Sequence, residues 1–67
     1  MDKSAIGQRL RELRGDRTQE AVATAVHVTP MAVSKYENGQ MVPTDDVKIK
    51  LAAYFNTTVD AIFFNHG

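Results

Sequence analysis

The sequence predicts an all-α fold of five short helices that form one domain over residues 1–67. Apolar residues recur at spacings of three and four, the period of one face of a helix, and no segment alternates as a strand does. Threonines precede several of these apolar runs, where their hydroxyls suit helix N-caps. A chain of 67 residues buries about 60% of its unfolded surface, so it supports a single compact core.

The first helix is expected from Ser4 to Arg14, and Gly15 with Asp16 should end it. Its apolar positions lie three or four residues apart and therefore share one face. The buried stripe of this helix is predicted to comprise Ile6, Leu10 and Leu13.

Residues 19–38 predict two short helices joined by a tight turn. Thr18 and Thr29 stand at N-cap positions, and Pro30 follows at a first helical position, where a missing N–H costs nothing. Gly39 suits the left-handed conformation that ends the second helix. The apolar residues of this pair, which should bury the inner faces and the turn, are Val22, Ala23, Val26, Val28, Val33 and Tyr36.

Two further helices are predicted in the last third of the chain. Thr44 is expected to cap the first of them, with Asp45 and Asp46 in the first turn, where they complement the helix dipole. Thr57 and Asp60 match a capping box that opens the second. The inward-facing residues are expected to be Val47, Leu51, Tyr54 and Phe55 in the first helix, and Ile62 with either Phe63 or Phe64 in the second.

Composition argues against several functional classes. The chain has no cysteine and two histidines, so we expect neither a disulfide framework nor a metal site. No nucleophile stands beside a convincing base and no glycine loop could cradle phosphate, so we predict no enzyme activity and no cofactor. No apolar run approaches the ~18 residues of a membrane span. The start of the chain carries no apolar signal region, which indicates a cytoplasmic protein with no membrane partner.

The charge of the chain is balanced but unevenly distributed. Eight basic residues match eight acidic ones, so the formal net charge is zero. Because many DNA-binding domains are strongly basic, a net charge of zero counts at first sight against binding to DNA. The distribution of the charges matters more than their sum, since one face can be positive while the molecule is neutral. The arginines that crowd the first quarter of the chain are Arg9, Arg11, Arg14 and Arg17.

An ordered set of short motifs runs through most of the chain. The motifs are Thr18-Gln19-Glu20, Ala23, Val28-Thr29, Tyr36-Glu37-Asn38-Gly39, Leu51-Ala52 and Val59-Asp60-Ala61-Ile62-Phe63. Together, over residues 6–63, they resemble the XRE family of helix-turn-helix regulators, which includes the lambdoid phage repressors and Cro proteins. The resemblance implies a lambda-repressor-like domain that binds double-stranded DNA sequence-specifically and regulates transcription. We expect a repressor of the phage or mobile-element type.

The resemblance also assigns roles to individual residues. The helix after Thr29 would lie in the major groove, and Lys35 could donate to guanine or contact a phosphate, two readings that both stay open. The expected base-facing residues are Thr29, Pro30, Met31, Ser34 and Lys35. The expected phosphate contacts are Arg17, Gln19, Asn38 and Gln40.

Three residues are expected to have structural roles. The family resemblance pairs Arg14 with Glu37, which would fasten the first helix to the DNA-reading helix. His27 stands where the family usually has glycine, so we expect a strained, structural histidine. The link before Thr18 is about two residues shorter than in the common family pattern, and Arg17 replaces an apolar residue there, which alters the core at that point.

The expected partner is a roughly palindromic DNA operator bound by two copies of the chain. Phe63 and Phe64 point about 100° apart on a helix, so one can fill the core while the other is left for a homodimer contact. A chain this short offers little area, so the dimer is expected to be weak away from DNA. The alternative is a protein-interaction module or an antitoxin-like regulator on the same scaffold, which the neutral charge and the two phenylalanines would also suit.

Overall fold

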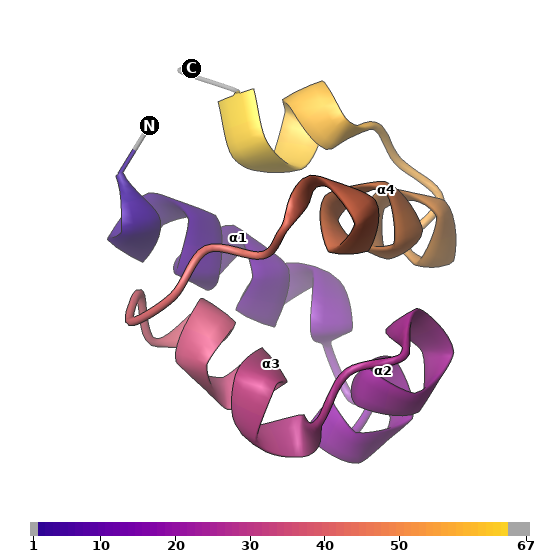
Figure 1. Cartoon of the computed structure of the whole chain (residues 1–67). Helices are drawn as coiled ribbons and strands as arrows, with labels where there is room; N and C mark the ends of the chain where they lie inside the picture. Colours follow the sequence, from indigo (N-terminus) through magenta and orange to yellow (C-terminus); the bar gives the residue numbers. More distant parts are fainter. Residues whose placement is uncertain (1, 65–67) are drawn as a thin grey trace.

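The computed structural model describes residues 2–64 and is helical throughout its regular segments (Figure 1). The described part of the chain contains no strand, which confirms the predicted all-α class. No helix within it is both long enough and apolar enough to span a bilayer. The elements in chain order are α1 (Lys3–Arg14), α2 (Gln19–Val26), α3 (Pro30–Glu37), α4 (Asp45–Tyr54) and η1 (Asp60–Phe64), the last a short π-helix.

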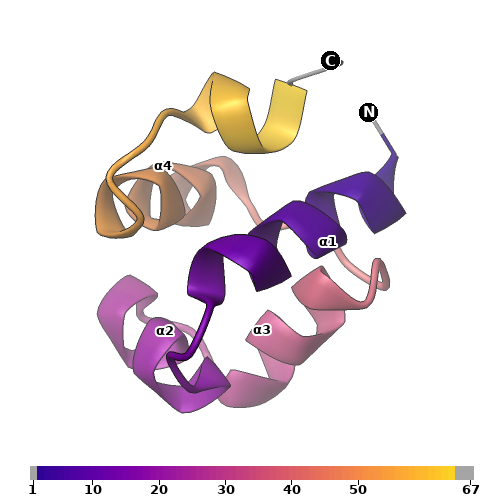
Figure 2. The ribbon, with the colours of Figure 1, turned by 180° about the vertical axis from the view of Figure 1, so that it is seen from behind.

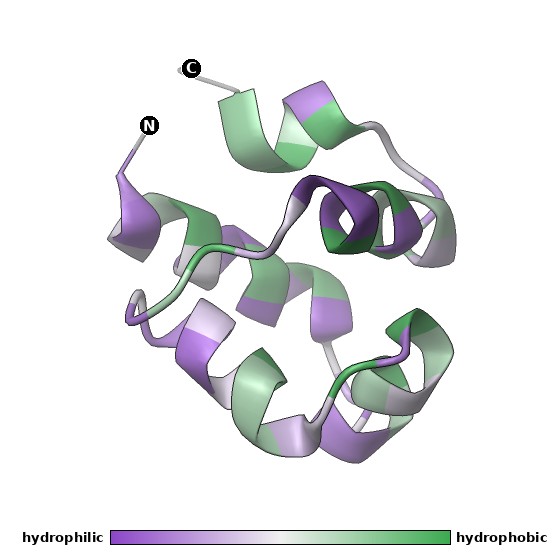
Figure 3. Cartoon of the chain, viewed as in Figure 1, coloured by the Kyte–Doolittle hydropathy of each residue, from purple (hydrophilic) through white to green (hydrophobic). Residues whose placement is uncertain are grey.

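Helix α1 packs against α3 on one side and against η1 on the other. Helix α2 packs against both α3 and α4, so the α2–α3 pair and the α4–η1 part of the chain also meet beside α1 (Figures 1 and 2). Helix α1 carries an apolar and a polar side, as an amphipathic helix does (Figure 3). One core fills the centre, and its residues are Ile6, Leu10, Val22, Ala23, Val26, Val33, Tyr36, Leu51, Ala52, Ile62 and Phe63.

Helix α1 packs unusually closely on the C-terminal end of α3. Gly7 is buried at this crossing, and a Cβ atom on it would lie 2.3 Å from the carbonyl oxygen of Glu37. Only a residue without a side chain therefore fits there. At the start of the same helix, Asp2 accepts a hydrogen bond from the amide of Ala5 at 2.7 Å, so α1 begins at Lys3, one residue earlier than predicted.

The predicted caps of α2 and α3 are confirmed. The hydroxyl of Thr18 accepts from the amide of Ala21 at 3.0 Å, and that of Thr29 accepts from the amide of Ala32 at 3.1 Å. His27 ends α2 with φ 63° and ψ 42°, the left-handed conformation expected of it. The turn is closed by two hydrogen bonds in the pattern of a Schellman motif, Val28 N–H to Ala23 O and His27 N–H to Thr24 O.

Two of the predicted caps are wrong in detail. Thr44 occupies the N-cap position of α4, but its side chain makes no capping hydrogen bond. The capping box at Thr57 is one residue out of register: the hydroxyl of Thr58, not that of Thr57, accepts from the amide of Ala61 at 3.0 Å. Adjacent threonines offer the same capping chemistry, so the sequence does not distinguish Thr57 from Thr58.

Candidate nucleic-acid interface

The outward side of α3 carries the residues that were predicted to face bases. Met31 is 68% exposed, which is high for a large apolar side chain, and Lys35 lies one turn later and is also exposed. Thr29 and Pro30 are exposed at the start of the helix, with the Thr29 hydroxyl already engaged in the cap. Ser34 is only half-buried and completes the set. The opposite side of α3 is held in the core by Val33 and Tyr36, so the structure brings these five residues to one free surface.

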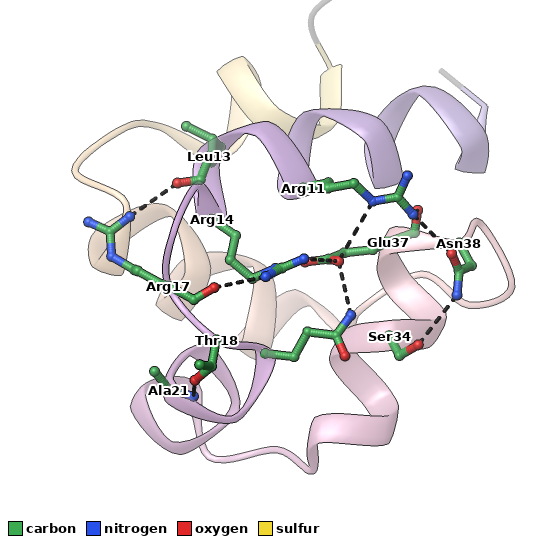
Figure 4. A network of polar contacts seen from close by, with 10 residues as sticks. Arg11, Leu13, Arg14, Arg17, Thr18, Ala21, Ser34, Glu37 and Asn38 are labelled. Carbon is green, nitrogen blue, oxygen red and sulfur yellow. Dashed lines mark hydrogen bonds and ion pairs between the residues drawn. The ribbon is translucent and has the colours of Figure 1, made fainter.

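The buried carboxylate of Glu37 ties α1 and α2 to the end of α3 (Figure 4). The Nε atom of Arg14 lies 2.6 Å from one carboxylate oxygen, and its second guanidinium nitrogen lies 3.1 Å from the other. Gln19 donates its side-chain amide to the same carboxylate at 3.1 Å. The predicted Arg14–Glu37 pair is thus present in the structure as a two-point contact, and its hydrogen bond raises the pKa of Arg14 above the ordinary value.

Arg11 adds a second link between α1 and α3, one that the sequence did not predict. Its guanidinium donates to the side-chain oxygen of Asn38 at 3.0 Å and to the backbone carbonyl of Glu37 at 3.4 Å. Asn38 in turn donates to the hydroxyl of Ser34 at 3.3 Å. A cation at the C-terminal end of α3 also complements the negative end of the helix dipole.

The residues expected to contact phosphate divide into two groups. Gln19 at the start of α2 donates to Glu37, the last residue of α3, and Asn38 and Gln40 follow that residue, so these three lie at the C-terminal end of α3. Gly39 between the latter two has φ 73°, and Gln40 N–H closes the helix on Lys35 O at 2.9 Å. The phosphate contacts expected of these three residues stay a prediction.

The Arg17 side chain is directed toward α4, and the phosphate contact expected of it stays a prediction. Its guanidinium stacks 5.4 Å from the ring centre of Tyr54 and 5.7 Å from that of Phe55, and it donates to the carbonyl of Leu13 at 3.1 Å. Aromatic faces attract guanidinium groups, and this contact fills the place of the apolar residue usual in the family. The arginine therefore connects the short α1–α2 link to the end of α4.

The two C-terminal phenylalanines have opposite surroundings. Phe63 is 2% exposed and belongs to the core, so it is not available to a partner, whereas Phe64 is 52% exposed. The ammonium of Lys48 lies 5.5 Å from the Phe63 ring and 5.6 Å from the Phe64 ring. Lys48 thus lies beside the two rings, and its ammonium is also 3.6 Å from the exposed carboxylate of Asp45.

Comparison with known proteins places the chain in a family. The profile of the HTH_3 family, described as Helix-turn-helix, matches residues 8–62. The restriction-modification controller protein C.AhdI from Aeromonas hydrophila is 31% identical, with 90% of this chain and 94% of that protein aligned and a TM-score of 0.81. No curated protein sequence matches the chain.

Two less similar structures share the fold. The P22 c2 repressor is 24% identical over 85% of this chain and 89% of its own, with a TM-score of 0.83. The clp gene regulator ClgR from Corynebacterium glutamicum is 23% identical over 92% of this chain and 68% of its own, with a TM-score of 0.82. The chain belongs to the HTH_3 family of XRE-type helix-turn-helix proteins, and it is a DNA-binding regulator of transcription.

Proposed function

We propose that this protein is a sequence-specific repressor of the phage or mobile-element type that reads the major groove with α3. The proposal is based on the way in which α3 is held in the domain. Its inner side is buried through Val33 and Tyr36, its last residue is fastened to α1 and α2 through Glu37, and its outer side is left exposed. A helix held in this way can enter the major groove as a rigid unit.

The proposed base-facing residues are those on the outward side of α3. Lys35 is the strongest candidate for a base reader because an ammonium can donate to the O6 and N7 atoms of guanine. Thr29 and Ser34 carry hydroxyls that can still donate a hydrogen bond after accepting one. Their neighbours Pro30 and Met31 offer apolar contact only.

The proposed phosphate contacts are Gln19, Asn38 and Gln40. A primary amide carries two N–H groups, so Gln19 can donate one to Glu37 and the other to a phosphate beside the positive end of α2. Such contacts fix the position of the domain on the duplex without reading sequence. The P22 c2 repressor, which shares this fold, is known in complex with a synthetic operator, and that supports DNA as the partner.

We further propose that two copies bind one roughly palindromic operator. A single α3 spans few base pairs, so one copy would lack both affinity and discrimination. Two-fold pairing would place two reading helices about one DNA turn, ~34 Å, apart. Phe64 is exposed on η1, which lies across α1 from α3, so a contact there leaves α3 free for DNA.

The test begins with selection of binding sequences from a pool of randomised DNA duplexes. Lys35→Ala should weaken binding to the selected duplex by about 1–3 kcal/mol and relax the base preference. Gln19→Ala should weaken binding to all duplexes alike, with melting curves recorded to correct for its bond to Glu37. If neither variant changes the gel shift of the selected duplex, α3 is not the reading helix.

Sedimentation of the complex tests the dimer. Two protomers per duplex are expected, and Phe64→Ser should lower the cooperativity of binding while leaving the melting temperature nearly unchanged, because the side chain is half exposed. A complex of one protomer with an asymmetric footprint would contradict the proposed pairing.

A further inference from the structure

The first turn of α3 presents an apolar surface where DNA-reading helices need to discriminate between bases. Met31 is 68% exposed, and Pro30 before it has no backbone N–H. The nearby hydroxyls of Thr29 and Ser34 each accept one hydrogen bond within the protein and keep one O–H to donate. At Pro30 and Met31 themselves, the helix offers carbon and sulfur where an amide or guanidinium would offer hydrogen-bond donors.

In the major groove, an apolar side chain can distinguish one feature. Each base pair shows a pattern of donors and acceptors there, and thymine adds a methyl group on C5. A thioether is a weak hydrogen-bond acceptor. It can therefore make an apolar contact with that methyl group but interacts only weakly with the hydrogen-bond donors beside it. Cytosine methylated on C5 presents the same group at the same position of the ring.

We propose that Met31 recognises the 5-methyl group of a pyrimidine in each half of the operator. The inference rests on the proposed function, in which α3 lies in the major groove. It specifies that function further: at this position the protein senses the methyl group itself, so thymine is favoured over uracil and 5-methylcytosine over cytosine. Binding of the regulator would then depend on cytosine methylation wherever the facing base pair is C·G.

The methyl group supplies a modest and calculable part of the affinity. Removing one buried methyl group forfeits the hydrophobic transfer free energy of one carbon, which corresponds to about a fourfold change in the dissociation constant. Met31 adds a large flexible side chain that can close around such a group. Because Met31 is exposed in the free protein, its removal should not disturb the core.

The experiment uses the full chain and the duplex selected from the randomised pool. Each thymine of that duplex is replaced in turn by uracil, which removes only the methyl group. In each half-site one replacement should weaken the wild-type protein about fourfold and leave Met31→Ala unaffected. A second pair of duplexes carries a C·G base pair at that position, with the cytosine either methylated on C5 or unmethylated. The wild type should bind the methylated duplex about fourfold more tightly, and Met31→Ala should bind the two duplexes equally.

Lys35→Ala is the matched control, since it lies one turn away on the same side of α3. It should bind every duplex more weakly and keep the fourfold ratio between thymine and uracil. Equal binding of thymine and uracil duplexes by the wild type would overturn the inference, and so would a ratio that persists in Met31→Ala. If the pool yields no enriched sequence at all, the proposed function itself fails, a result distinct from enrichment without methyl dependence.

Discussion

Arg14 and Glu37 are joined by two contacts, 2.6 Å from Nε to one carboxylate oxygen and 3.1 Å from a terminal nitrogen to the other. The pair is enclosed on the carboxylate side, where the Glu37 side chain is 2% exposed, and partly open on the guanidinium side, where Arg14 is 20% exposed. It joins helices α1 and α3 across 23 residues of sequence. Its loss would leave a charge without its main partner inside the domain.

Arg14→Met should destabilise the domain by about 3 kcal/mol, because it leaves the carboxylate of Glu37 buried with Gln19 as its close partner and Arg11 3.9 Å away. Urea denaturation followed by circular dichroism measures the change. The double variant Arg14→Met with Glu37→Met should recover much of the loss, because apolar side chains replace both charges. If Arg14→Met were as stable as the wild type, the ion pair would orient α1 and α3 without contributing to the stability of the domain.

Gly7→Ala should destabilise the domain by about 1–3 kcal/mol or more, since the added methyl group meets the backbone of Glu37 and Tyr36. The sign of the change in unfolding free energy is informative, because a glycine-to-alanine substitution on an open helix surface normally stabilises by up to about 1 kcal/mol. Gln8→Ala at the neighbouring exposed position is the control and should stay within about 0.5 kcal/mol of the wild type. A stabilised Gly7→Ala would mean that α1 and α3 can move apart freely.

His27→Gly should stabilise the domain by about 0.5–1 kcal/mol. The left-handed conformation of His27 costs a residue with a side chain roughly 1–2 kcal/mol, and the greater freedom of glycine in the unfolded chain offsets part of the gain. Chemical denaturation midpoints decide the question. His27→Ala serves as the comparison and should give no gain, because alanine meets the same restriction. An unchanged midpoint for His27→Gly would contradict the assignment of strain.

Val33→Asp should unfold the domain, because Val33 is 3% exposed and a carboxylate there would be buried without a partner. A circular-dichroism melt at neutral pH reports the outcome. Ala25→Asp on the exposed side of α2 introduces the same charge outside the core and should keep a cooperative melt. If Val33→Asp melts like the wild type, the packing of α3 on the core is wrong.

Alkaline pH should destabilise the wild type more than Tyr36→Phe. Burial raises the pKa of Tyr36 above its ordinary value of 10.0, so the folded state holds the phenol proton more tightly than the unfolded state does. The resulting stabilisation is complete below pH 10.0 and is lost as the pH rises through the folded pKa. Unfolding free energies measured at pH 8 and above pH 10 give the slope of stability against pH for the wild type and for Tyr36→Phe. Parallel slopes for both proteins would contradict this account.

The features that were predicted correctly from the sequence depend on neighbouring residues. The caps at Thr18 and Thr29, the end of α1 at Gly15 and the left-handed His27 each involve residues within four positions of one another. Periodicity also identified the core of the α2–α3 pair, apart from Val28, which is only partly buried. In α1, Leu13 is likewise only partly buried because the helix ends there.

The contacts that were missed join residues distant in the sequence. Arg11 reaches Asn38, Gly7 contacts Glu37, and the Arg17 guanidinium packs on Tyr54 of α4. A charged side chain on a helix surface gives no local sign of which distant group it will meet. Gly7 did offer a signal, since an isolated glycine inside a helical pattern often marks a close approach.

The fastening of α3 at Glu37 has a consequence for how such a regulator can change its target. The groups that fix the helix, Glu37 with Arg14 and Gln19, lie at its end and beside it, while Met31 and Lys35 point away from all of them. Exchanging the outward pair alters neither the core nor the ion pair. In the proposed function, base recognition by Met31 and Lys35 and the fastening of α3 by Glu37 would therefore depend on different residues of one eight-residue helix. If α3 reads the operator as proposed, substitutions at these two positions would change the target sequence without lowering the stability of the domain.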